Sequence, residues 1–513
     1  MSNRYFKVME AYFKNSDIAR NNANFVRSIN NLAGIIVGEV MKDYQFDVLY
    51  KGLPTKDIHN EGWAYLHQTF LASPYCIGLS SKDIAMFGIQ SNAKNERSAK
   101  PPKRLETFFM QSANLICLIA QEVSGATSLN DLATIGAGYL YHLEKTGKKQ
   151  YSHYDLKNIW QEFLFNVNLP FRTGNNSPFS NITLEFGKPN PHLAEEYVVF
   201  GGNPIDIKYK EIPEDYYNRM VDAFIDAMSE GDSEGRPFTF PLITVNLYPD
   251  FDWDNKIFKK LLEKSDYFGG LYFQNYQEKP FKEGKYVELN KFIEPFDIGM
   301  IYSNCCRMTF DISDVVKYTG SNPFHSNSGV GGIGVYNINM NRLLFLAKDD
   351  FELFTYLFDY IFEVGVKTLQ RKRQFIREHW EDLFPYLSYY QKTDKSLFNI
   401  FSVVGVHEGL INAGFKDGLK GKEGKEYGLK LANYIREKIE KAIEETGELF
   451  SLEYAPSENA ACKLAEKDIA FARKCYEMLQ GKKEVLSKDK VLDDKTKFVV
   501  ETQGEKLFTK IAK

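Results

Sequence analysis

Short runs rich in β-branched and aromatic residues alternate with segments of helical periodicity along this 513-residue chain. The clearest β-rich runs are YVVFGG (197–202), PLITVNL (241–247), GLYFQN (270–275) and GIGVYNINM (332–340). Between them, apolar residues recur every three or four positions, which is the period of a helix packed along one face. The alternation predicts an α/β architecture.

Two segments have the pattern of long helices. Residues 351–379 begin with an apolar stripe and then become basic, so we expect a long helix whose first half is buried. The stripe consists of Phe351, Phe354, Leu357, Phe358, Ile361 and Phe362. Residues 427–450 repeat apolar residues on one face and reach Gly447, which we predict to be a helix C-cap.

Composition limits the class of protein. With 43% hydrophobic and 15% aromatic residues, the chain can bury a sizeable core. A net charge of -4 gives no electrostatic case for nucleic acid or an anionic membrane as partner. The N-terminus lacks the apolar core of a signal peptide, and no run of about 18 apolar residues occurs. We therefore expect a cytoplasmic protein.

The chain has six cysteines and no CxxC pair, which argues against a disulfide scaffold and predicts no metal site. Two of them, Cys305 and Cys306, are adjacent in SNCCRMTF and precede Arg307. A disulfide between neighbours would strain the peptide bond. The pair is therefore either two small buried side chains or a reactive thiol beside a cation that favours the thiolate.

Two further stretches concentrate polar groups. Residues 165–187 read as an apolar strand, a polar turn and a second strand, so their polar atoms would cluster at a turn or strand end. In residues 451–468, Pro456, Ser457 and Asn459 precede an Ala-rich helical run. Such a helix start is either an ordinary N-cap or a phosphate-binding site.

Several stretches, in this order, resemble the anaerobic class III ribonucleoside-triphosphate reductases, which are glycyl-radical enzymes. The resemblance covers about residues 20–475 and is carried by EVSGATSLNDLATIGAGYL (122–140), SPFSNITLEF (177–186), RPFTFPLITVNLYPDFDWDN (236–255), SNCCRMTFD (303–311), GGIGVYNINMNR (331–342), FSVVGVHEGL (401–410) and LEYAPSENAA (452–461). It implies a ten-stranded α/β barrel made of two five-stranded halves, with a central finger loop.

The resemblance also implies three parts of the chain. Residues 1–100 would be a mainly helical lead into the barrel, and residues 101–479 the catalytic barrel with its finger loop near 296–312. Residues 480–513, rich in Lys and Asp, would form a charged tail and a possible docking segment.

By resemblance, Cys306 is the radical carrier that abstracts hydrogen from C3′ of the ribose, after which the 2′-hydroxyl leaves as water. Cys305 would be its neighbour. Cys76, in SPYCIGLSS, matches the cysteine expected to face Cys306 and share a disulfide radical, although a plain core cysteine remains an alternative. Cys117 lies in an apolar helical run and is expected to be packing. The implied substrate-binding residues are Ser177, Asn181, Pro456, Ser457, Asn459 and Ala460.

The sequence departs from the family at two sites. By resemblance, His407 stands where the family has asparagine before a glutamate, here Glu408. These two residues are candidates for the barrel mouth, and a satisfied core residue is the alternative for His407. Formate-using members carry an asparagine after the finger loop, and none adjoins Ile333 here. The reductant is therefore left open between formate and a redoxin.

The largest departure concerns the radical source. The 513 residues contain neither paired CxxC motifs nor an Arg-Val-x-Gly-Tyr type glycyl loop. Three explanations are open. The glycyl-radical domain is on a second polypeptide, the chain is a fragment, or the protein has lost catalysis and kept nucleotide binding. We expect the first arrangement, with a radical-SAM activating enzyme, nucleoside triphosphate substrates and effectors, and a homodimer. The alternative function is a non-catalytic nucleotide-binding or regulatory homologue.

Overall fold

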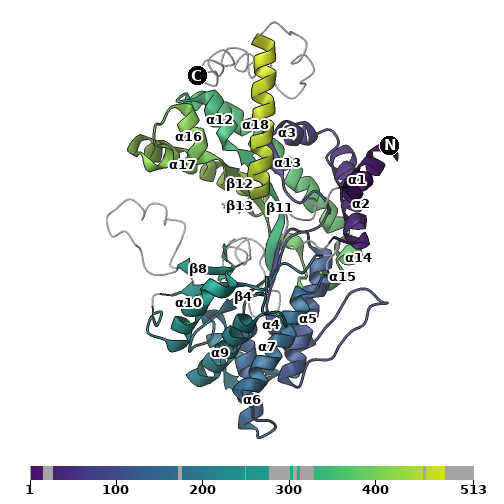
Figure 1. Ribbon diagram of the computed structural model, residues 1–513, viewed down its shortest axis with the longest axis vertical. Helices are drawn as coiled ribbons and strands as arrows, with labels where there is room; N and C mark the ends of the chain where they lie inside the picture. Colours follow the sequence, from purple (N-terminus) through teal and green to yellow (C-terminus); the bar gives the residue numbers. More distant parts are fainter. Residues whose placement is uncertain are drawn as a thin grey trace. The chain divides into compact units, whose positions relative to one another are not determined.

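The computed structural model describes residues 2–14, 27–171, 176–248, 250–275, 301–303, 309–311, 329–453 and 458–479. Two compact units are formed (Figure 1). The first unit comprises Met1–Glu39, Ser73–Gly331 and His379–Ser396. The second unit comprises Val40–Ala72, Gly332–Glu378 and Leu397–Lys513.

The first unit contains a parallel sheet. Its five strands pair in the order β2 (Ile77–Leu79), β3 (Thr127–Leu129), β4 (Ser180–Leu184), β7 (Leu242–Leu247) and β8 (Leu271–Asn275). Val330 and Gly331, the first residues of β11 (Val330–Asn339), pair antiparallel to β2, with Val330 opposite Gly78. β2, β3 and β4 are buried along their whole length, as expected for parallel strands covered on both faces. Five parallel strands match the half-barrel that the resemblance implies.

The other elements of the first unit are mainly helical. Its described helices include α1 (Ser2–Lys14), α4 (Ser81–Phe87), α5 (Leu105–Glu122), α6 (Leu132–Lys145), α7 (His153–Asn168), α8 (Pro191–Ala194), α9 (Glu214–Glu230), α10 (Lys256–Phe268), α14 (Trp380–Leu383) and α15 (Pro385–Tyr390). Two hairpins pair β5 (Tyr197–Phe200) with β6 (Asn203–Lys208), and β9 (Ile301–Ser303) with β10 (Thr309–Asp311). Helix α2 (Ile29–Tyr44) runs from the first unit into the second.

The prediction of a strand just before the polar turn in residues 165–187 is wrong, because Phe165–Asn168 form the last turn of α7 (His153–Asn168). A capping box starts this helix: Ser152 accepts a hydrogen bond from Asp155 N, and the Asp155 carboxylate accepts one from Ser152 N. Trp160 and Phe163 then bury one face of the helix. The run FNVNL (165–169) covers only the last turn of this helix, so by itself it did not show the helical period of the apolar residues.

The second unit combines a small group of strands with long helices. Its strands are β1 (Ala64–Leu66), β11 (Val330–Asn339), β12 (Leu397–Val404) and β13 (Phe450–Glu453), with β1 antiparallel to β11 and β12 parallel to β13. Its helices are α3 (Thr55–Glu61), α12 (Met340–Ala347), α13 (Phe351–Glu378), α16 (Val406–Ala413), α17 (Lys422–Thr446) and α18 (Glu458–Leu479). Helix α17 ends at Gly447, whose φ of 67° provides the predicted left-handed cap.

The core of the second unit follows the apolar stripe read from the sequence. On α13, the rings of Phe354, Phe358 and Phe362 stack at steps of four residues, with centroids 5.6 and 5.7 Å apart. Phe362 then stacks on Phe401 of β12 at 4.4 Å, and Phe401 lies 6.2 Å from Phe450 of β13. The expectation of a long helix is confirmed, but its buried face is not limited to the first half: it continues through Lys372 and Arg373 to Ile376.

No helix in the described parts of the chain has the length and apolar character needed to cross a membrane.

Candidate active site

One face of the parallel sheet in the first unit carries buried polar side chains. Ser128 on β3 is the register partner of Asn181 on β4, and Thr183 on β4 is the partner of Thr244 on β7. Hydroxyl-to-amide hydrogen bonds cross between the strands: Thr183 donates to Asn130 Oδ1 and Thr244 to Asn181 Oδ1, both at 3.0 Å. Side chains that alternate with these, such as Ile182 and Ile243, point to the opposite face.

Asn181, which the resemblance assigns to substrate binding, lies on this polar face and is fully buried. Its Oδ1 is used by Thr244, while its Nδ2 has no hydrogen-bond partner among the described residues. A buried amide donor without a partner costs free energy unless a ligand or water accepts from it. Asn181 therefore offers a donor to a hydroxyl or carbonyl oxygen of a bound molecule.

Cys76 lies at one end of the same face. It immediately precedes β2, two residues before Gly78, and Gly78 is the register partner of Ser128. The pleat therefore places Cys76 on the side of the sheet that carries Ser128 and Asn181. Its side chain is fully buried, and Ala126 N donates a hydrogen bond to Sγ at 3.2 Å. The structure thus brings Cys76 and Asn181 to one polar face.

Ser177, the other candidate of this stretch, is half-buried just before β4. Its hydroxyl donates to Asn168 O at 2.7 Å, and Asn168 Oδ1 accepts from Thr239 N and Phe240 N. These bonds tie the end of α7 to the segment leading into β7. Ser177 therefore has a structural bond here, and its contact with a substrate stays a prediction.

Glu185 is a polar-face residue that the sequence reasoning missed. It follows β4 directly, and its Oε1 accepts from Tyr248 OH (3.1 Å), Asn246 Nδ2 (3.3 Å) and Asn190 Nδ2 (3.4 Å). Burial raises the pKa of Glu185 to about 8, although the hydrogen bonds from Tyr248 and Asn246 oppose this shift. The available signal was an acidic residue directly after an apolar strand in SNITLEF.

In the second unit, the expected phosphate-binding helix is α18. Asn459 is exposed in its first turn, whereas Ala460 is fully buried. Pro456 and Ser457 lie outside the described residues. Cys305 and Cys306, the neighbouring cysteines of the predicted finger loop, also lie outside them. The helix start predicted at this point is therefore confirmed at Glu458, and its function stays a prediction.

Helix α18 is held by a partly buried ion pair between Asp468 and Arg342. Asp468 accepts from Arg342 Nε (2.7 Å), Asn339 Nδ2 (2.9 Å) and Asn341 Nδ2 (3.0 Å). The guanidinium of Arg342 contacts two aromatic rings, 5.2 Å from the Trp63 centroid and 4.6 Å from that of Phe471. These contacts fix α18 to α12 and to the segment before β1, so they determine where the helix start is presented.

The two barrel-mouth candidates are found at the start of α16. His407 is half-buried, and its Nδ1 accepts a hydrogen bond from Leu419 N at 3.1 Å. This bond holds the turn before α17 in place. Glu408 is exposed. Neither position establishes a role in chemistry, and both assignments stay predictions.

Of the remaining cysteines, Cys117 is buried in α5, and burial raises the pKa of its thiol to about 12, as fits a packing residue. Cys462 is exposed on α18.

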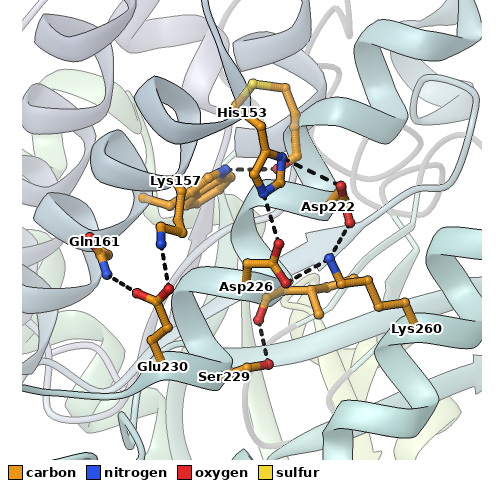
Figure 2. Close-up of polar contacts among 11 residues, drawn as sticks. His153, Lys157, Gln161, Asp222, Asp226, Ser229, Glu230 and Lys260 are labelled. Atoms are coloured by element: carbon orange, nitrogen blue, oxygen red, sulfur yellow. Dashed lines mark hydrogen bonds and ion pairs between the residues drawn. The ribbon is translucent and has the colours of Figure 1, made fainter.

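Three helices of the first unit meet at a cluster of charged side chains (Figure 2). His153 of α7 lies between two carboxylates of α9, with Nε2 2.8 Å from Asp226 and Nδ1 3.5 Å from Asp222. These three residues could offer ligand atoms to one metal ion. Lys260 of α10, however, already lies 2.5 Å from Asp222 and 2.7 Å from Asp226, so its ammonium is paired with both carboxylates. We interpret the cluster as an interhelical ion pair.

Comparison with known proteins gives a consistent result. The family model described as anaerobic ribonucleoside-triphosphate reductase matches residues 21–508. The structure of the anaerobic ribonucleotide reductase from Thermotoga maritima with citrate in the active site superimposes with a TM-score of 0.69 at 19% identity, covering 90% of this chain and 80% of that one. The complex of that protein with dATP and CTP gives a TM-score of 0.66 at 18% identity, with 86% and 72% covered. The comparison with curated proteins returns no match.

Proposed function

Because the chain belongs to the anaerobic ribonucleoside-triphosphate reductase family and has the α/β barrel fold of those enzymes, we propose a radical mechanism carried by two cysteines. As the catalytic chain of an oxidoreductase, it converts ribonucleotides to deoxyribonucleotides in the cytoplasm. Cys306 carries the thiyl radical, Cys305 is its neighbour, and Cys76 is the second thiol.

The observation that supports this proposal most directly is the position of Cys76. Its sulfur is fully buried at the end of a face lined by hydroxyl and amide groups. A sugar needs such groups for its hydroxyls, because each can donate and accept hydrogen bonds. A thiyl radical also requires exclusion of water and oxygen. A cysteine used only for packing would need neither the polar face nor the unsatisfied amide of Asn181.

The triphosphate is bound, in this proposal, at the start of α18 by Pro456, Ser457, Asn459 and Ala460. The first backbone N–H groups of a helix and its dipole favour phosphate oxygens. Ser177 and Asn181 are the other substrate-binding residues of this proposal, and His407 and Glu408 are its candidates for the barrel mouth. The dATP and CTP bound by the Thermotoga maritima protein support nucleoside triphosphates as effector and substrate here.

The radical is supplied from outside these 513 residues. They contain no CxxC pair and no Arg-Val-x-Gly-Tyr type sequence, and a thiol cannot reach the potential of a thiyl radical unaided. We place the glycyl radical on a second polypeptide that docks on a homodimer of this chain, with a radical-SAM protein as its activator. The reductant is formate or a redoxin, and the missing asparagine beside Ile333 weighs against formate.

The test is an anaerobic assay of this chain with ribonucleoside triphosphates, with and without the glycyl-radical polypeptide and its activator. Deoxynucleotide is measured by chromatography. Cys306→Ser should abolish product while nucleotide binding, measured by calorimetry, is unchanged. Cys117→Ser, which alters a buried thiol that packs in α5, is the matched control and should retain full activity. Cys305→Ser tests whether the neighbouring thiol contributes.

Full activity of Cys306→Ser would refute the radical role of this residue. Nucleotide binding without product under every condition, including added radical partner, would instead favour the second function, a non-catalytic nucleotide-binding or regulatory homologue.

A further inference from the structure

The segment before β3 is bonded to the segment that carries Cys76. Ser124 N donates to Pro74 O, and Ile77 N donates to Ala126 O, both at 2.8 Å. Between these two bonds, Gly125 N donates to Tyr75 O. The three contacts form a continuous backbone ladder, so the position of residues 124–126 determines the position of residues 74–77.

Within this ladder, the sulfur of Cys76 lies directly against Gly125. A Cβ atom added at Gly125 would lie 2.4 Å from Cys76 Sγ and 2.4 Å from Tyr75 O, which is closer than atoms can approach. Gly125 is not among the glycines with positive φ, so an alanine could adopt its backbone conformation. Glycine is therefore needed here for space, and this space is occupied by the thiol of Cys76 and by the carbonyl group of Tyr75.

The next residue provides a bond to the same atom. Ala126 N donates to Cys76 Sγ at 3.2 Å, and both residues are buried. Sulfur is a weak acceptor as a thiol, but a hydrogen bond to the charged form stabilises a thiolate. A backbone donor is also fixed in direction, unlike a side chain that can rotate.

We propose that Gly125 and Ala126 are positioning residues for Cys76. Gly125 supplies the space in which the sulfur lies, and Ala126 N–H fixes its direction and stabilises negative charge on it. The inference rests on the proposed function of Cys76, and it adds that the segment before β3 prepares this thiol for chemistry.

The first test is a double-mutant cycle. Gly125→Ala should lower the melting temperature of the chain, and the loss should be smaller by about 2–6 °C in a Cys76→Ala background, where the contact with sulfur is gone. Gly136→Ala is the matched control: Gly136 is also buried, but its added Cβ would meet Phe109 at 3.0 Å. Its effect should be equal in the two backgrounds. If Gly125→Ala lowered the melting temperature equally in both backgrounds, the proposal that Gly125 supplies space for the sulfur would be refuted.

The second test removes the hydrogen bond and leaves the side chain intact. A backbone ester at Ala126, introduced with the α-hydroxy analogue of alanine, lacks the N–H group. The pH titration of Cys76, followed by NMR of cysteine labelled with carbon-13 at Cβ in the intact chain, should have its midpoint raised by about one pH unit or more, because a hydrogen bond to the charged form is being lost. An ester at Ala137 in α6 should leave the midpoint unchanged.

An unchanged titration midpoint of Cys76 in the Ala126 ester would contradict the proposed stabilisation of negative charge on the sulfur. Both tests use the chain alone and need no radical, so they can fail independently of the proposed function. A third test measures turnover with the radical partner. Gly125→Ala should reduce kcat and leave nucleotide binding unchanged, whereas Gly136→Ala should alter neither quantity. Normal kcat in Gly125→Ala would refute the positioning role.

Discussion

Lys372 allows the sharpest quantitative prediction, because its ammonium group is buried in the second unit. The residue lies on α13 and is 1% exposed, and its Nζ is 3.1 Å from the position that a Cβ of Gly334 on β11 would occupy. No hydrogen bond or ion pair to Lys372 occurs among the described residues. Burial lowers the pKa of this amine from 10.5 to about 7.

The sign of the effect on stability follows from the two pKa values. The folded chain binds the proton more weakly than the unfolded chain, so the free energy of unfolding rises with pH between about 7 and 10.5. Each pKa unit is worth about 1.4 kcal/mol, so the cost of burying Lys372 is on the order of 5 kcal/mol below pH 7. It falls to about 2 kcal/mol near pH 9 and vanishes above pH 10.5.

Lys372→Met keeps the unbranched chain and removes the charge. We expect this variant to be more stable than the wild type by several kcal/mol at pH 6.5, and equal to it at pH 10.5. Lys367→Met, an exposed position on the same helix, is the control and should change stability by no more than about 0.5 kcal/mol at either pH.

The assay can be confined to the second unit, because Trp63 is its only tryptophan. In a background with Trp160, Trp253 and Trp380 replaced by Phe, fluorescence during urea unfolding reports the buried Trp63 alone. A Lys372→Met variant that is less stable than the wild type, or whose difference does not change with pH, would refute the reasoning.

Two further predictions concern the carboxylates of Glu185, which is buried, and Asp468, which is partly buried. For Glu185, the folded-state pKa of about 8 lies above the ordinary 4.5, so the wild type loses stability as pH rises from 4.5 to 8. Glu185→Gln should remove this loss. A difference in melting temperature between this variant and the wild type that is equal at pH 5 and pH 8.5 would contradict the prediction. Asp468→Asn should destabilise the second unit by about 2 kcal/mol or more, because Arg342, 2% exposed, loses its carboxylate. The Trp63 urea transition measures this, and an unchanged midpoint would show that the ion pair does not hold α18.

Several elements could be predicted from local pattern because their signal lies within one segment. The stripe of phenylalanines on α13, the cap at Gly447 and the strands β7, β8 and β11 each follow from periodicity or from one residue with a special conformation. The order of motifs likewise predicted the family, because it depends on residue identity along the chain and not on contacts.

The errors and omissions have a common physical cause. Phe165–Asn168 could be read as part of a strand, because the short run FNVNL, in which apolar residues alternate with asparagine, does not distinguish the end of a helix from a strand. Glu185 and Lys372 were missed because a charged residue in sequence is normally exposed, and only the packing of neighbouring elements removes it from water.

The sequence by itself determined which chemical groups this protein carries and the order of its strands and helices, since both are encoded locally. Only the tertiary structure decided which of these groups share an environment. Cys76 and Asn181 are more than a hundred positions apart, yet the parallel register of β2, β3 and β4 places them on one face. Gly125 looks like an ordinary loop glycine until its neighbour across the ladder proves to be the sulfur of Cys76. Burial and register arise from contacts between distant segments, and these contacts form only when the whole chain has folded.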